Sequence, residues 1–249
     1  MVKPNRTATN FSDPKIVRKY GVYPLIHQVV SKPALLKFIG DVKGHRVLDF
    51  GCGNGHITHA LTQRGALCIG VDPSHTFILA ARSDYPNLDF RQIRRSSLEG
   101  FKRAQFDKVI LSLVLPGLNS KREFKALFQE ASKVLKNGGE LVLSTLHPLM
   151  IRNFKDAFRT VTIPASMNYF STGAKFKNTV RLIDNTFMSF TNIHWTLEDI
   201  SNELNINGLV ITGIKEPKLP KSKYQSVLKN ALHTPYVICI KAKKLANTV

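Results

Sequence analysis

The sequence predicts an α/β fold in which helices cover both faces of a largely parallel sheet. Two observations support this class. Short apolar runs typical of buried strands alternate with segments of helical periodicity, and one such run leads directly into a glycine-rich turn. The 249 residues contain no internal repeat and no low-complexity linker, so we expect one domain.

The first part of the chain contains most of the expected strands and two clear helices. The clearest helix is predicted at Lys121–Lys136, where apolar residues recur at helical spacing and Asn137-Gly138-Gly139 supplies the stop. A shorter helix is expected to begin near Asn54 and to end at Gly65. The apolar runs that predict buried strands are His45–Phe50, Leu67–Asp72, Leu88–Gln92, Asp107–Leu113 and Glu140–Leu146.

The pattern changes after Leu146. Residues 147–193 are rich in aromatic residues and Asn and show no long regular element, so we expect a lid or small cap there. A helix is expected at Thr196–Ile206, with Thr196 as its N-cap and Asp199 completing an approximate capping box. Closing strands are expected at Val210–Lys215 and Tyr236–Lys241, with a loop at 216–235 between them.

Composition limits the compartment and the partners. Lys and Arg outnumber Asp and Glu by 36 to 17, a formal net charge of +19 that fits a solvated lysine-rich surface or, as the alternative, a polyanion partner. Three widely spaced cysteines form neither a disulfide framework nor a metal-binding pattern. With no apolar run long enough to span a membrane, we expect a cytoplasmic monomer or homodimer with no membrane partner.

The segment Val47–Gly55 (VLDFGCGNG) carries the most informative motif. An apolar strand runs into a glycine turn that opens a helix, where backbone N–H donors are unpaired and a ligand can approach the main chain closely. Asp72 ends the next strand, where a carboxylate can accept hydrogen bonds from both hydroxyls of a ribose. Dinucleotide dehydrogenases share this layout, but their glycines follow GxGxxG, whereas here they stand as GxGxG.

At these residues the sequence resembles the class I S-adenosylmethionine-dependent methyltransferases, specifically the small-molecule group of the methyltransferase type 11/12 kind. The resemblance covers most of the chain. Beyond the glycine turn, it includes Gly70–Ser74, Phe106–Ile110, Leu135–Leu141, His194–Asp199, Glu216-Pro217 and Pro235-Tyr236.

The resemblance implies a Rossmann-like, doubly wound sheet of seven strands whose last strand is antiparallel. We accordingly expect N-terminal helices in 1–44, including one or two stretches within Val22–Ile39 interrupted at Pro33. A cofactor-binding core would follow in 45–146, then a substrate cap in 147–193 and a closing helix and strands in 194–249. The implied cofactor is S-adenosyl-L-methionine, and the residues expected to bind it are Asp49, Gly51, Cys52, Gly53, Asn54, Gly55, Asp72, Pro73, Ser97, Leu98, Ser112 and Leu113.

One position departs from the family pattern. The family usually places an acidic residue shortly after the third strand, where it accepts a hydrogen bond from the adenine amino group. This chain has Arg94 and Arg95 there, and arginine cannot accept that bond. Ser96, Ser97 or a backbone carbonyl would have to substitute, or the adenine would be held more loosely.

Two histidines are candidates for a catalytic role. His147 follows the fifth strand at the edge where this fold places substrates, so it is our first candidate for a general base, with anchoring of the loop as the alternative. His194 is the second, with a capping or packing role as its alternative. Tyr20, Tyr169 and Phe170 are candidates for lining an acceptor pocket.

We expect no metal site, since His56 and His59 share a helix without a third ligand at suitable spacing.

The sequence therefore favours methyl transfer to a small-molecule acceptor. An RNA methyltransferase is the first alternative and rests on the positive charge; it is not favoured, because the chain has neither an NPPY-type motif nor a Pro-Cys nucleophile. A cofactor-binding regulatory subunit without catalysis is the second. It rests on Arg94 and on the lack of an assigned base.

Overall fold

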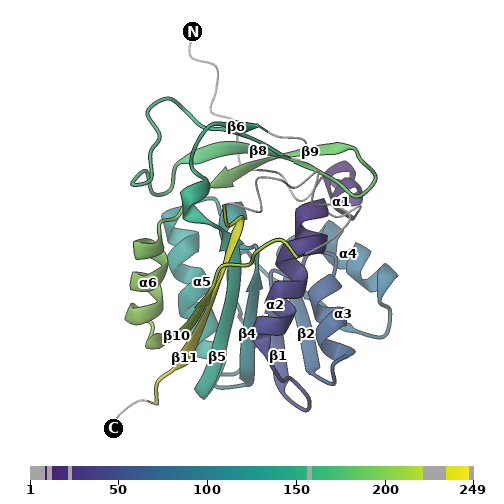
Figure 1. The fold of residues 1–249 in the computed structure, drawn as a ribbon. Helices are drawn as coiled ribbons and strands as arrows, with labels where there is room; N and C mark the ends of the chain where they lie inside the picture. The colour runs from purple at the N-terminus through teal and green to yellow at the C-terminus, as the bar shows by residue number, and fades with distance from the viewer. Residues whose placement is uncertain (1–8, 10–12, 22–23, 156–158, 221–233, 247–249) are drawn as a thin grey trace.

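The computed structural model describes residue 9 and residues 13–21, 24–155, 159–220 and 234–246. A seven-stranded sheet forms the centre of these residues, helices lie on both of its faces, and a smaller four-stranded sheet covers one end (Figure 1). The predicted α/β class is confirmed.

The central sheet has the strand order β10-β11-β5-β4-β1-β2-β3. Strands β3, β2, β1, β4 and β5 pair in parallel, whereas β11 runs antiparallel to both of its neighbours. The last strand is therefore antiparallel, as predicted. The strand bounds are β1 Arg46–Phe50, β2 Leu67–Asp72, β3 Asp89–Gln92, β4 Phe106–Ser112, β5 Leu135–Leu146, β10 Leu209–Lys215 and β11 Val237–Lys244.

Alternating side chains of the strands build two cores, one on each face of the sheet. Leu48 belongs to the core shared with helices α5 and α6, and its neighbour Val47 belongs to the core shared with α2 and α3.

No helix in the described part of the chain is long and apolar enough to cross a membrane. The helix bounds are α1 Pro14–Gly21, α2 Lys32–Ile39, α3 His56–Thr62, α4 His75–Asp84, α5 Lys121–Val134 and α6 Leu197–Ile206.

Two helix predictions need correction. Helix α5 ends at Val134 and β5 begins at Leu135, so Asn137-Gly138-Gly139 lies inside the strand instead of stopping the helix. Pro33 does not interrupt its helix. A π turn at His27–Ser31 leads directly into α2, and Pro33 lies in the first turn of α2, where a missing N–H is tolerated. Residues 22–23 of the predicted segment lie outside the described residues.

The segment 147–193 is more regular than expected. It forms an antiparallel sheet, here called the cap sheet, of β6 Phe154–Lys155, β7 Arg159–Thr162, β8 Lys175–Arg181 and β9 Phe187–Ile193. The expectation of no long regular element was wrong, because polar residues such as Asn178 and Asn192 occupy buried positions in β8 and β9. These residues obscure the apolar alternation by which strands are recognised.

The closing part follows the prediction. Thr196 caps α6, accepting a hydrogen bond from the Asp199 N–H while the Asp199 carboxylate accepts from the Thr196 N–H, which is a complete capping box. In the predicted loop at 216–235, residues 221–233 lie outside the described residues.

Candidate functional site

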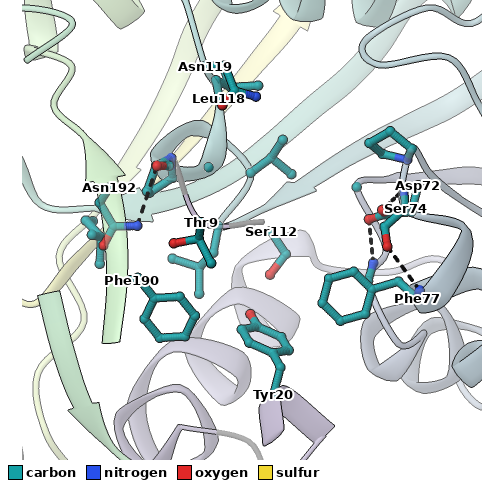
Figure 2. Close-up of a pocket in the computed structure, with 18 of the residues that line it drawn as sticks. Thr9, Tyr20, Asp72, Ser74, Phe77, Ser112, Leu118, Asn119, Phe190 and Asn192 are labelled. Atoms are coloured by element: carbon teal, nitrogen blue, oxygen red, sulfur yellow. Dashed lines mark hydrogen bonds between the residues drawn. The ribbon is translucent and has the colours of Figure 1, made fainter. Parts of the chain in front are cut away.

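A cavity of about 610 Å³ lies between the carboxyl ends of the parallel strands and the cap sheet. The segments that follow β1, β2 and β4 line one side of it, and β8 and β9 line the other. Figure 2 shows Asp72 and Phe77 on one side, Phe190 and Asn192 on the other, and Tyr20 and Ser112 between them. The topology therefore brings the two predicted regions, glycine turn and cap, to one cavity.

Asp72 is the anionic residue of the strand-end wall. Its Oδ2 accepts a hydrogen bond from the Gly53 N–H at 3.0 Å, and its Oδ1 accepts one from the Ser74 N–H at 2.8 Å. Burial raises the pKa of this carboxyl to about 6, against the lowering effect of these two bonds. Each oxygen keeps a further lone pair, so the carboxylate can accept two more hydrogen bonds from a ligand.

Two glycines of the turn have different roles. A Cβ on Gly53 would meet no atom within 4 Å, which is open space at the cavity wall. A Cβ on Gly55 would lie 2.5 Å from Cζ of Phe90, and the positive φ of Gly55, 81°, also favours glycine. Gly53 therefore leaves room for a ligand, and Gly55 leaves room for a core side chain.

Asp49 lies behind the wall and does not line the cavity. It is fully buried, and its Oδ2 accepts a hydrogen bond from Thr58 Oγ1 at 2.7 Å. Burial raises its pKa to about 7. Of the residues expected to bind the cofactor, Gly51, Gly53, Asp72, Pro73, Ser112 and Leu113 line the cavity, whereas Asp49, Cys52, Asn54, Gly55, Ser97 and Leu98 do not.

The segment after β3 contributes differently from the prediction. Ser96 lines the cavity in place of Ser97, and Leu98 is buried in the core with its N–H donating to Glu130 Oε2. Arg95 also lines the cavity, and its Nη1 lies 3.0 Å from Oε1 of Glu123. Glu123 comes from α5 and supplies a carboxylate beside the segment that lacks one. Sequence reasoning missed it, because its position emerges only when α5 packs on the sheet.

His147 does not line the main cavity. Its Nδ1 accepts a hydrogen bond from the Leu149 N–H at 3.2 Å, and its Nε2 lies 2.8 Å from Oε1 of Glu216. One neutral tautomer, with the hydrogen on Nε2, satisfies both contacts. This geometry matches the anchoring alternative.

The other candidates divide in the same way. Tyr20 lines the cavity and packs edge-on against Phe190, with ring centroids 5.9 Å apart. His194 contacts the Tyr169 carbonyl oxygen through Nε2 at 2.7 Å, and neither residue lines the cavity. Phe170 is 81% exposed and also lies outside the lining. Both Tyr169 and Phe170 belong to the loop before β8, so of the three residues expected to line an acceptor pocket the structure places only Tyr20 in the cavity lining.

The cap side of the cavity contains residues that the sequence did not single out. Burial lowers the pKa of His27 to about 3, with the charge of Arg159 as a second cause, so its imidazole is neutral at physiological pH. The sequence carried no signal for the two asparagines, because Asn is uncommon in strands and the strands that contain them were not predicted. The missed residues are Thr9, His27, Asn178, Phe190, Asn192 and Tyr236.

Within the described residues, no group of three or more His, Cys, Asp or Glu side chains is placed to hold a metal ion. The two helical histidines contact Tyr85 instead. His56 Nδ1 lies 2.8 Å from the Tyr85 hydroxyl, and His59 stacks on the Tyr85 ring at 4.4 Å.

Known proteins share both the motif region and the fold. A family model described as "Methyltransferase domain" matches residues 48–143. The ubiquinone biosynthesis O-methyltransferase of Idiomarina loihiensis is 31% identical over 135 residues, which cover 51% of this chain and 54% of that protein. The S-adenosylmethionine-dependent methyltransferase structure from Mesorhizobium loti has a TM-score of 0.66 at 22% identity and covers 85% of this chain and 96% of that one.

Residues 48–143 therefore match a methyltransferase domain, and the fold is that of solved S-adenosylmethionine-dependent methyltransferases. The predicted family and its cofactor, S-adenosyl-L-methionine, are thereby confirmed. The chain spans about half the length of several curated relatives that it matches; the matched region is 48% of one relative and 54% of another.

The residues that line the cavity fit this cofactor. The carboxylate of Asp72 keeps lone pairs that would accept hydrogen bonds from the ribose hydroxyls, and the open space at Gly53 would let the ligand reach the main chain. Pro73 and Ser96 also line the cavity and would lie beside the base, while Ser112 and Leu113 line it at the end of β4.

The glycine pair gives a direct test of this assignment. Gly53→Ala should cost only about 1–2 kcal/mol of stability, from the positive φ, but should weaken binding of S-adenosylhomocysteine at least about tenfold, because the methyl group enters the ligand's space. Gly55→Ala should add an overpacking cost of about 1–3 kcal/mol against Phe90. Urea unfolding and calorimetry measure the two effects. Equal loss of affinity in both variants would contradict the division of roles.

Cofactor affinity should also depend on pH. Protonation removes an acceptor from Asp72, so affinity for S-adenosylhomocysteine should be constant above pH 7 and should fall as the pH drops through about 6.

The control for the pH test is Asp72→Asn, which should bind weakly with little change across the same range. If this variant kept the full pH dependence, the titrating group would be Asp49, whose pKa of about 7 lies in the same range.

Proposed function

We propose that this protein transfers the methyl group of S-adenosylmethionine to an oxygen of a small-molecule acceptor. The observation that carries the proposal is one cavity with two chemically different halves, a strand-end half with Asp72 and a cap half with aromatic and amide side chains. The relatives named ubiquinone biosynthesis O-methyltransferases support an oxygen acceptor.

The bound cofactor would supply an already activated methyl group on its sulfonium. The chain then has to hold the acceptor oxygen in line with the bond between sulfur and the methyl group, and it has to exclude water. The cap sheet, which covers the cavity, would contribute to both. Tyr20 and His27 line the cavity as neutral groups, because burial raises the pKa of Tyr20 to about 12 and lowers that of His27 to about 3. They would orient the acceptor through hydrogen bonds without holding a charge at neutral pH.

An activity test separates this proposal from its alternatives. The purified protein is incubated with methyl-tritiated S-adenosylmethionine and either a desalted small-molecule extract or total RNA. We expect label in the small-molecule fraction. Label in RNA alone would favour the RNA methyltransferase, for which the charge of +19 is the argument. No transfer to either, with S-adenosylhomocysteine still bound in calorimetry, would favour a non-catalytic subunit.

Replacing His147 tests whether a general base is needed. We expect His147→Ala to lose about 1–3 kcal/mol of stability, because the Leu149 N–H loses its acceptor and Glu216 its partner, while the methyl-transfer rate stays near normal. Thermal unfolding and initial rates measure both.

His194→Ala is the matched comparison, since it also removes one buried imidazole outside the cavity. A drop of about 10²–10⁴ in rate for His147→Ala alone, with stability kept, would restore His147 as the general base.

A further inference from the structure

The inner face of the cap sheet carries a line of three polar residues. Arg159 in β7, Asn178 in β8 and Asn192 in β9 are exposed by 0%, 3% and 8%. In the strand register Arg159 pairs with Val180 and Asn178 pairs with Phe190, so the three polar residues follow a diagonal across the sheet. Burying adjacent polar groups in an otherwise apolar face costs free energy, so this line calls for a functional explanation.

The hydrogen bonds along this line run in one direction. Arginine can only donate, so Asn178 turns Oδ1 toward Arg159 Nε, at 3.0 Å. The Asn178 amide nitrogen then faces Asn192 and donates to its Oδ1 at 3.1 Å. Asn192 is left with its own nitrogen directed toward the Pro116 carbonyl oxygen, at 3.5 Å. Arg159 thereby fixes the orientation of both amides.

This orientation leaves an unused hydrogen-bond donor on each of the two asparagines, and both residues line the cavity. An amide nitrogen carries two hydrogens, and the bonds within the described residues use one of them on each asparagine. The second hydrogen of each is available to an acceptor atom on a ligand. The lining at this end is thus a donor pair and would bind an oxygen that accepts hydrogen bonds.

A positive charge and aromatic walls adjoin the donor pair. The Arg159 guanidinium lies 4.5 Å from the centroid of the Tyr236 ring, and that ring lines the cavity. The charge acts on the cavity wall, because it is one cause of the lowered pKa of His27. Tyr20 and Phe190 also line the cavity with aromatic rings, against which a flat ring of a ligand could pack.

We propose that Asn178 and Asn192 anchor a carboxylate carried by an aromatic acceptor, with Arg159 as the residue that orients both amides and supplies the opposite charge. The inference rests on the proposed function for placing the acceptor in this half of the cavity. It assigns the ligand class, a ring bearing an anionic oxygen, and the residues that would discriminate it from a neutral ring of the same size.

The test compares two probes that share a phenol ring and differ in the substituent opposite its hydroxyl group. 4-Hydroxybenzoate carries the carboxylate, and 4-hydroxybenzyl alcohol carries a neutral hydroxymethyl group in its place. Calorimetry measures both against the protein saturated with S-adenosylhomocysteine. We expect 4-hydroxybenzoate to bind at least about tenfold more tightly, the range for hydrogen bonds to a charged group.

The decisive variant is Asn178→Asp. A carboxylate still accepts from Arg159 but has no hydrogen to donate and repels the probe's charge, so binding of 4-hydroxybenzoate should weaken at least about tenfold. Binding of the alcohol should change little, because its uncharged hydroxyl group can instead donate a hydrogen bond to the new carboxylate, and binding of S-adenosylhomocysteine should not change. Thr179→Val is the matched control, because Thr179 lies on the same strand and its hydroxyl pairs with exposed Ser189.

Three outcomes would overturn the anchor: equal affinity of the wild type for both probes, no binding of 4-hydroxybenzoate at about 10 mM, or unchanged binding of it by Asn178→Asp. Methyl transfer to neutral acceptors alongside any of these results would leave the proposed function standing. Binding of 4-hydroxybenzoate as expected, with no methyl transfer to any acceptor, would instead remove the proposed function.

Discussion

The hydrogen bond from the Gly53 N–H to the Asp72 carboxylate is the constraint on which the site depends. It joins the turn after β1 to the end of β2, two neighbouring parallel strands, and so fixes the glycine turn relative to the carboxylate. The Ser74 N–H holds the other carboxylate oxygen, and the same serine caps α4. The wall facing the cofactor is therefore set by backbone donors before any ligand is present.

This arrangement has an electrostatic cost. Burial raises the pKa of Asp49 to about 7 and that of Asp72 to about 6, both from 3.8. Because the folded state binds these protons more tightly than the unfolded state, their contribution to stability is complete below about pH 4. It is lost as the pH rises through 6 and 7. The fold thus buries two carboxyl groups near the glycine turn at a cost in stability at neutral pH. Asp72 lines the cavity, and Asp49, which accepts a hydrogen bond from Thr58, lies behind it.

The cap sheet imposes a second cost on the other side of the cavity. Its inner face combines an apolar alternation with Arg159, Asn178 and Asn192, and its outer face carries a short polar pair, Thr179 and Ser189. Side chains on the inner face are held by each other and by the loop at Pro116, so the amides keep one orientation. The two halves of the cavity are therefore preorganised differently. Backbone N–H donors hold the strand-end half, and a line of hydrogen-bonded side chains holds the cap half.

Local patterns in the sequence determined the order of the elements and the cofactor turn. The strand bounds at Leu67–Asp72, the capping box at Thr196 and the glycine turn at Gly53 depend on neighbouring residues, so they could be predicted. Tertiary packing alone decided which side chains meet in the cavity: Glu123 arrives from α5, Asn178 from the cap sheet and Tyr236 from beside β11, far apart in the chain. Tertiary packing also decided that His147 does not line the cavity. Its contact with Glu216 depends on the pairing of β11 with β5, which the local sequence does not determine.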